Sequence, residues 1–173
     1  MKNLILFLSI TLASGLLFTN LYTSMIDARS WGADLPNSIG TAREYFKVTN
    51  PGNFFRIFSP INQVVAVLAL ILFWKAAPSV RLHLGVAAIL YILCDVLTFA
   101  YFFPRNDFMF RDALLTDVDA LKNTWNEWTR MNWLRTFMLL AGLGLSFFSL
   151  HRIYQQSTVT KYTTSRIAET LTV

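Results

Sequence analysis

The segment Arg81–Phe103, RLHLGVAAILYILCDVLTFAYFF, is apolar along most of its length but carries a carboxylate, Asp95, in its second half. A second apolar segment, Met131–Tyr154, carries Arg135 in the same way. A charge in hydrocarbon costs about 3 kcal/mol on insertion scales, so it usually faces the interior of a helix bundle, a partner or water. Because the two segments are consecutive, we expect antiparallel neighbours whose two charges lie toward one membrane face and meet there.

The composition favours a membrane protein over a soluble one. Of the 173 residues, 54% are hydrophobic and only 14% are charged, which is unusual for a soluble domain of this size. Each of four apolar segments approaches the ~20 residues that a helix needs to cross a bilayer: Leu4–Met25, Pro60–Ala77, Leu82–Phe103 and Trp133–Leu150. The sequence therefore predicts an all-α fold, with a four-helix transmembrane domain over residues 1–154 and a polar, loosely ordered cytoplasmic tail over residues 155–173.

The distribution of charge predicts the orientation. Basic residues gather near both termini and in the short second loop, whereas the first and third loops mix basic and acidic residues. The positive-inside rule then places both termini in the cytoplasm, in an integral multi-pass protein of the inner or plasma membrane. The net charge of +5 does not indicate nucleic-acid binding, because the basic residues form no single patch. The first apolar run extends well past the signal-like Ala13-Ser14-Gly15, so we expect a retained helix.

The two outer loops are long for a small bundle. The first, Ile26–Phe58, contains a predicted helix over Ser38–Lys47 with Ser38 as its N-cap, and a predicted turn over Asn50–Asn53. Ser59-Pro60 suits the start of the second membrane helix. The third loop ends in a segment with apolar residues on one helical face, Val118, Leu121, Trp125 and Trp128. We interpret it as an amphipathic helix at the membrane interface, which can continue directly into the fourth span.

Polar residues recur on all four predicted spans at similar depth. They include Asn20, Asn62, Gln63, Tyr91, Asp95, Thr98, Asn132 and Arg135. Lipid penalises such groups unless they satisfy one another or a ligand. Two interpretations stand at this point: interhelical hydrogen bonds that hold the bundle together, or a binding site. The high cost of two charges tips the balance toward a site.

Metal and cofactor chemistry is disfavoured by the motifs. The chain has no CxxC, no HExxH, no Gly-rich phosphate loop and no carboxylate–histidine cluster. His83 and His151 could reach similar depth and bind a haem from two sides. Their neighbours Arg81 and Arg152 instead suggest positions at the headgroup level. We therefore expect no cofactor and no metal.

Several short motifs on the outer side resemble the anthrone-oxygenase-like family of small four-helix membrane proteins. The most specific is the approach to the fourth span, Trp125-x-x-Trp128-x-x-x-Asn132-x-x-Arg135-Thr136. Weaker similarities are Asn20-x-Tyr22, DARSWG at 27–32, Phe55-Arg56 with Ser59-Pro60-x-Asn62, and Pro104-Arg105-Asn106-Asp107. The similarity extends over most of the chain up to about Tyr154.

The resemblance implies a cofactor-independent oxygenase that converts aromatic anthrones to anthraquinones. By this interpretation Asp95 is the base and Arg135, Asn132 and Asn62 hold the oxyanion. Tyr101 and Trp128 would stack on the aromatic rings, and Asn20 belongs to the same set of substrate-binding candidates. No histidine lies on the outer side, so a family member that relies on a histidine base is not matched.

The alternative is a non-enzymatic membrane protein. It would bind a lipid or a quinone-like molecule, or serve as a subunit of a larger complex. A pocket with room for a ring system would favour the enzyme, whereas polar groups that bond only one another would favour the alternative. Transport is disfavoured, because four helices without an internal repeat make little alternating-access machinery. The expected partners are the bilayer and a hydrophobic small molecule, and the oligomeric state stays open.

Overall fold

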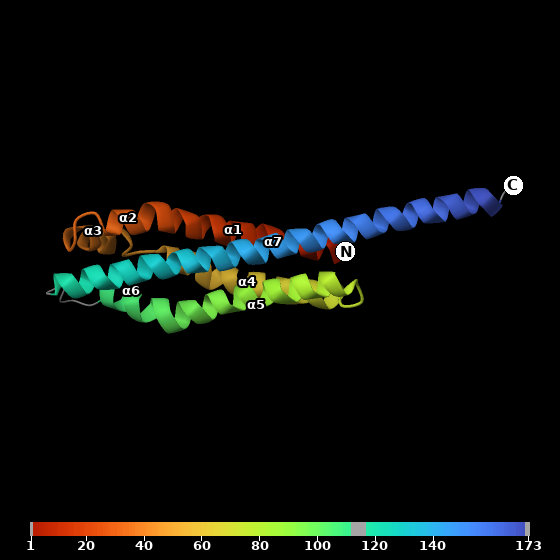
Figure 1. Cartoon of the computed structure of the whole chain (residues 1–173). Coiled ribbons are helices and arrows are strands. Elements are labelled where there is room, and N and C mark those ends of the chain that lie inside the picture. Colours follow the sequence, from red (N-terminus) through yellow and green to blue (C-terminus); the bar gives the residue numbers. More distant parts are fainter. Residues whose placement is uncertain (1, 112–116, 172–173) are drawn as a thin grey trace.

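The protein is a bundle of long helices in a computed structural model that describes residues 2–111 and 117–171 (Figure 1). Within these ranges every regular element is helical. Four helical stretches are long and apolar enough to cross a membrane: Lys2–Trp31, Pro51–Leu72, Pro78–Phe110 and Val118–Gln156. The prediction of an all-α, four-helix transmembrane bundle is therefore confirmed.

The first membrane helix is longer than hydropathy indicates. α1 (Lys2–Tyr22) passes through one π-helical turn, η1 (Thr23–Asp27), into α2 (Ala28–Trp31) without leaving the helical conformation. The predicted boundary at about Met25 is thus too early. The extension carries the chain beyond the apolar run, so that α2 lies at the end of the bundle away from the two termini, which is called the outer end below (Figure 1).

The first loop is largely helical. α3 (Asn37–Tyr45) confirms the predicted helix, but its N-cap position is Pro36 rather than Ser38. α4 (Pro51–Leu72) begins where a turn was predicted, because the Asn50 Oδ1 accepts the Gly52 N–H at 2.9 Å and caps the helix. The predicted start at Ser59-Pro60 is therefore wrong, and Pro60 lies inside the helix.

The third membrane helix also continues outward past its apolar run. α5 (Pro78–Leu97) leads through a second π-helical turn, η2 (Thr98–Phe102), into α6 (Phe103–Phe110). The short reversal between α4 and α5 lies at the opposite end of the bundle (Figure 1).

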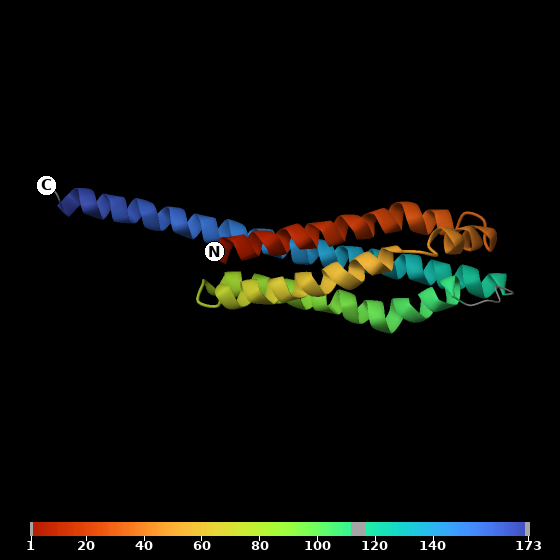
Figure 2. The ribbon, with the colours of Figure 1, turned by 180° about the vertical axis from the view of Figure 1, so that it is seen from behind.

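α7 is one helix from Val118 to Leu171. The predicted amphipathic segment and the fourth span are its first two parts, joined without a break. The backbone over residues 155–171 continues the helix, and loose order of this tail stays a prediction. In both ribbon views the C-terminal part of α7 extends beyond the bundle, past the N-terminus (Figures 1 and 2).

Two separate apolar cores support the bundle. The larger lies among α1, α4, α5 and α7 and includes Leu6, Leu16, Ala69, Val80 and Leu143. The smaller one lies at the outer end among α2, α3, α6 and the start of α7, and includes Trp31, Ile39, Phe102, Met109, Leu121 and Trp128. The contacts between α5 and α7 are the most extensive of any helix pair.

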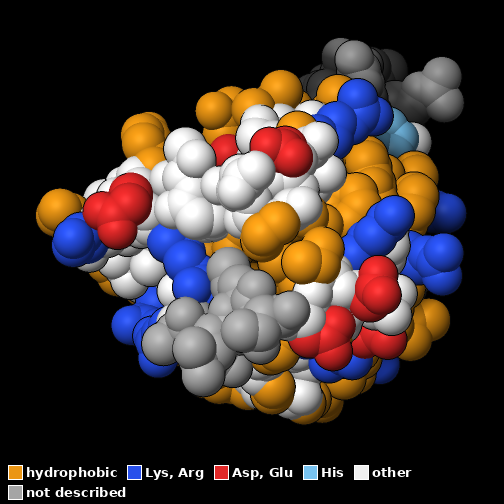
Figure 3. Space-filling model, turned by 90° about the vertical axis from the view of Figure 1, so that its left-hand side faces the viewer, with side chains coloured by type: hydrophobic (Ala, Val, Ile, Leu, Met, Phe, Trp, Pro, Cys, Tyr) orange, Lys and Arg blue, Asp and Glu red, His pale blue; other side chains and the backbone are white. Residues whose placement is uncertain are grey.

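The amphipathic start of α7 packs its apolar face on protein. Leu121 is fully buried and Trp128 is 4% exposed, while the Trp125 Nε1 donates to the Ala28 carbonyl oxygen at 2.7 Å. Its apolar face completes the outer core, and its position at the membrane interface stays a prediction. The end of the molecule formed by these elements carries a mixture of acidic, basic and apolar side chains (Figure 3).

Candidate functional site

Arg135 lies at the centre of a polar cluster between α1, η2 and α7. Its side chain is 7% exposed. Nε donates to Asn20 Oδ1 at 2.8 Å, Nη1 to Thr98 Oγ1 at 3.2 Å, and Nη2 to Asn132 Oδ1 at 2.6 Å. These bonds use three of the five N–H donors that a guanidinium carries. The cluster thus binds the cation through neutral acceptors, and two N–H donors of the guanidinium are not used by these bonds.

The two asparagines are held by further hydrogen bonds. The Asn20 Nδ2 donates to Thr136 Oγ1 at 2.6 Å, and the Asn132 Nδ2 donates to Ser24 Oγ at 2.6 Å. Asn20 and Asn132 are fully buried. Because each amide nitrogen is anchored, each amide oxygen is turned toward the guanidinium. The predicted candidates Asn20, Asn132 and Arg135 are therefore brought together.

Two aromatic rings enclose the guanidinium. The Arg135 Cζ lies 4.5 Å from the centroid of the Phe102 ring and 5.0 Å from that of Phe55. Such cation–π contacts are stronger where water is excluded. The rings come from η2 and from the start of α4, so four helices converge on this one cation.

Asp95 does not form the ion pair with Arg135 that the sequence suggested. The Asp95 carboxylate accepts hydrogen bonds from Ser59 Oγ at 2.5 Å and from Gln63 Nε2 at 2.6 Å, both on α4. Arg135 has no ion pair with any carboxylate in the described part of the chain. The prediction that the two charges meet is therefore wrong, and Asp95 instead joins α4 to α5.

The acid and the guanidinium are nevertheless close neighbours. Cys94 and Thr98, on either side of Asp95 along the same helix, both contact α7 at Arg135: the Cys94 thiol approaches the Arg135 carbonyl oxygen, and the Thr98 hydroxyl accepts from Nη1. The two charges interact electrostatically without touching. They form two adjacent polar sites, which α5 joins.

Asn62 is the unsatisfied member of the predicted set. It is 1% exposed, and within residues 2–111 and 117–171 neither its Nδ2 nor its Oδ1 has a hydrogen-bond partner. A buried amide without a partner costs about 1–3 kcal/mol. Asn62 lies one helical turn beyond Ser59 and two turns beyond Phe55, so it shares the inward face of α4 with the residues that contact Asp95 and Arg135.

Trp128 and Tyr101 lie outside the polar cluster. Trp128 packs edge-to-face with Trp31 and Phe102 in the outer core, with its Nε1 donating to Asn106 Oδ1 at 2.8 Å. Its ring is therefore occupied by protein contacts. Tyr101 lies on the surface side of η2, where the Arg105 guanidinium lies 3.5 Å from its ring centroid.

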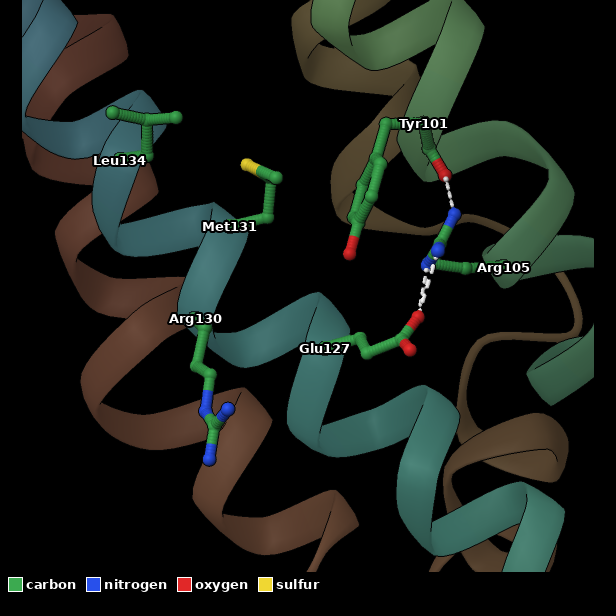
Figure 4. Close-up of a pocket in the computed structure, with 6 residues that line it drawn as sticks. All are labelled: Tyr101, Arg105, Glu127, Arg130, Met131 and Leu134. Atoms are coloured by element: carbon green, nitrogen blue, oxygen red, sulfur yellow. Dashed lines mark hydrogen bonds and ion pairs between the residues drawn. The ribbon is translucent and has the colours of Figure 1, made fainter.

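Tyr101 lines an open pocket between η2 and α7 (Figure 4). The pocket has a volume of about 460 Å³. Its other lining residues are Arg105, Glu127, Arg130, Met131 and Leu134. Phe102, the next residue along the chain, contacts the Tyr101 ring (5.7 Å between centroids) and also lies over the guanidinium of Arg135.

Some members of the two polar sites were not among the predicted site residues. Ser59 and Gln63 hold the Asp95 carboxylate, Ser24 anchors Asn132, and Phe55 covers Arg135. Ser24 lies one helical turn beyond Asn20, so the period of the helix could have identified it. Phe55 and Ser59 stood only in a weak family motif, and hydropathy does not single out Phe55 because apolar aromatic residues flank every span.

The histidines take no part in either polar site. The His83 ring packs at a tilt against Phe148, with centroids 6.5 Å apart, and His151 is exposed. Among the described residues no group of three or more His, Cys, Asp and Glu side chains could hold a metal ion.

Comparison with known proteins yields one match. A family model described as anthrone oxygenase matches residues 54–145, which cover α4, α5, η2, α6 and the part of α7 that carries Asn132 and Arg135. No curated protein and no solved structure matches the chain. The matched region is more than half of the 173 residues.

Proposed function

The chain belongs to the anthrone oxygenase family, and from this premise we propose that it is a membrane-embedded, cofactor-independent oxygenase acting on a hydrophobic aromatic substrate. The reacting group would be a CH₂ that lies between aromatic rings and is conjugated with a carbonyl. The polar cluster around Arg135 would be the site of the reaction.

The proposed reaction needs no oxidant besides O₂. Loss of a proton from the CH₂ gives an enolate, whose electrons reduce O₂ as a C–O bond forms at the same carbon. Loss of the second proton with cleavage of the O–O bond leaves a new C=O and releases water. The carbon loses four electrons, and O₂ gains four as one carbonyl oxygen and one water molecule.

The observation that carries the proposal is a buried cation that has no carboxylate partner among the described residues. Arg135 is held by amides, a hydroxyl and two aromatic rings, and two of its N–H donors are left over. Preorganised donors of this kind stabilise negative charge that develops during a reaction, particularly where water is excluded. An enolate oxygen is such a charge, and the guanidinium would neutralise it.

Asp95 is the candidate base in this proposal. Its carboxylate is held by Ser59 and Gln63 rather than by a cation. No cation among the described residues forms an ion pair with it, so no salt bridge has to break when the carboxylate takes up a proton. The proton would pass to Asp95 while Arg135, on the neighbouring site, takes the charge of the enolate.

Asn62 would supply a hydrogen bond to the substrate. Its two unpartnered amide atoms face the bundle interior beside Ser59. A ligand oxygen that accepted from Nδ2 would satisfy a group that otherwise costs stability.

The alternative function has an observation of its own in its favour. The guanidinium, Asn20, Asn132 and Thr136 bond one another directly, as expected of a cluster that joins membrane helices. A non-enzymatic protein that binds a lipid or a quinone-like molecule, or that serves as a subunit of a larger complex, would need no more than this.

Oxygen consumption separates the two candidates. The purified protein is placed in phosphatidylcholine nanodiscs with anthrone, and O₂ uptake and quinone formation are followed against empty nanodiscs. The enzyme predicts uptake of one O₂ for each quinone formed, above the spontaneous rate, and its loss in Arg135→Gln but not in the exposed control Arg152→Gln. A wild-type rate equal to that of empty nanodiscs contradicts it.

A double variant tests whether the charges belong to a site at all. Asp95→Asn combined with Arg135→Gln should fold but lose the thermal stabilisation that anthraquinone gives to the wild type. If the double variant is stable and is stabilised as before, the charges serve the architecture only.

A further inference from the structure

We propose that the open pocket between η2 and α7 is a docking site for a planar aromatic molecule that carries an anionic group and arrives from the membrane. This inference rests on the proposed function for the class of ligand. Its location, however, is distinct from the polar cluster, and its test does not depend on turnover.

The size and the lining of the pocket suit a small ring system. Its volume of about 460 Å³ lies within the ~300–1,000 Å³ of small-molecule sites. The Arg105 guanidinium covers one face of the Tyr101 ring, and Met131 lies on the other side of that ring (Figure 4). An aromatic plane inserted there would contact a ring face and a thioether, both of which are favourable partners for aromatic groups.

The charges at the pocket favour an anion. Glu127 is paired with Arg105, whose Nη2 lies 2.7 Å from Glu127 Oε2. Arg130 is exposed and has no hydrogen bond or ion pair among the described residues. In Figure 4 its side chain extends away from Tyr101 and Arg105. An anionic group would therefore bind at the outer rim, and the rings would lie deeper, against Met131 and Leu134.

The pocket adjoins the lipid-facing surface of α7. Leu134 is 48% exposed, and Phe137 and Leu140 continue the exposed apolar surface along the same helix. A hydrophobic molecule dissolved in the bilayer can reach the pocket sideways along this surface. It need not pass through the outer core, which covers the polar cluster on the aqueous side.

The pocket is one aromatic ring away from the polar cluster. The Phe102 ring contacts Tyr101 on the pocket side and lies over the Arg135 guanidinium on the other. Both aromatic residues belong to the π-helical turn η2, as does Thr98, which accepts from Arg135. π-Helical turns are frequent at functional sites. A ligand docked against Tyr101 thus lies beside the residue that must move for it to reach Arg135.

The test uses two probes with the same three-ring skeleton, anthraquinone-2-sulfonate as the anion and 2-methylanthraquinone as the neutral analogue. Binding is measured in phosphatidylcholine nanodiscs, with empty nanodiscs subtracted. Leu134→Trp should fill the pocket and weaken both probes about tenfold or more, whereas Leu140→Trp, equally exposed on α7 but outside the pocket, should leave both unchanged. Arg130→Gln should weaken only the sulfonate, by about threefold, and Arg29→Gln at the same end of the bundle should not.

Several outcomes would overturn the inference. One is wild-type binding of both probes by Leu134→Trp. Another is equal loss of the neutral and anionic probes in Arg130→Gln. A third is displacement of the sulfonate by phosphatidylglycerol in a manner that depends on Arg130, which would make the pocket a lipid site.

The failure of this inference and of the proposed function are distinguishable. Arg135→Gln should abolish anthrone oxidation yet retain docking of both probes. Docking that is sensitive to Leu134→Trp in a protein that consumes no O₂ would contradict the oxygenase function and support the docking site. Wild-type docking of both probes by Leu134→Trp, in a protein that does consume O₂ with anthrone, would do the reverse.

Discussion

At the scale of single residues, the guanidinium of Arg135 shows how a charge is kept within membrane depth. A charged side chain there costs several kcal/mol unless it is enclosed and hydrogen-bonded. Three helix-borne oxygen acceptors and two aromatic faces supply that environment. Each acceptor meets a different nitrogen of the planar fork, so the shape of the group matters as much as its charge.

We therefore expect Arg135→Lys to be a damaging change even though it keeps the charge. A lysine ammonium presents its donors from a single atom and cannot reach Asn20, Thr98 and Asn132 in the geometry of the fork. Loss of these buried bonds should lower the free energy of unfolding by about 1–3 kcal/mol and reduce oxidation. Thermal unfolding in nanodiscs measures the first and O₂ uptake the second. Arg152→Lys, at an exposed position, is the control; equal stability of Arg135→Lys and wild type would contradict the account.

A substitution of Asn62 should impair substrate binding without lowering the stability of the fold. Its amide is buried without partners, so Asn62→Leu, a change of similar volume, removes an unsatisfied group and should leave the melting temperature unchanged or raise it. The same change should abolish substrate binding if the amide awaits a ligand. Melting curves and O₂ uptake are measured together. A variant that is destabilised would show that the amide has a structural partner in the folded protein.

The sequence predicted which residues are buried better than which residues meet. Asn20, Asn62, Asn132 and Arg135 face the interior as their polarity in an apolar run required. The predicted pairing of Asp95 with Arg135 was wrong because successive positions turn by about 100° around a helix. Thr98 and Cys94 point toward α7, while Asp95, rotated by about 60° from Thr98, reaches α4. Hydropathy does not tell which of two neighbouring helices a buried side chain faces.

At the scale of helices, the outer boundaries were the least predictable. α4 and α7 begin well before their apolar runs, at Pro51 and Val118. A hydropathy window measures suitability for lipid, but these first turns pack against protein. The apolar face of Val118, Leu121, Trp125 and Trp128 was recognised, yet one face looks alike whether it contacts lipid or another helix.

The packing of α2 against α7 predicts a specific role for Gly32. A Cβ at this position would overlap the indole of Trp125, whose Nε1 is fixed to the Ala28 carbonyl oxygen. Gly32→Ala should therefore lower the free energy of unfolding by about 1–3 kcal/mol through overpacking. Gly15→Ala is the matched control, because nothing lies near that position and alanine favours the helix. Thermal melts of the two variants should shift in different directions; similar shifts would mean that α2 is not held against Trp125.

At the scale of the whole molecule, the polar cluster lies between two apolar cores. The larger core fills the bundle on the side of the termini, and the smaller one closes the outer end. Phe102 belongs to the outer core and also covers the guanidinium. The outer core thereby covers the cluster at this end of the bundle. A hydrophobic molecule would approach instead from the open pocket on the flank of η2.

The orientation of this bundle is a prediction that a single labelling experiment can test. The positive-inside rule places the termini and the α4–α5 turn in the cytoplasm, so α3 should face the exterior. The lone native cysteine, Cys94, is 4% exposed and should not react. In intact cells a membrane-impermeant maleimide should label Glu44→Cys on α3, whereas Thr158→Cys on the extension of α7 should react only after the membrane is permeabilised. Labelling of Thr158→Cys in intact cells would invert the topology, and the pocket between η2 and α7 would then open toward the cytoplasmic leaflet.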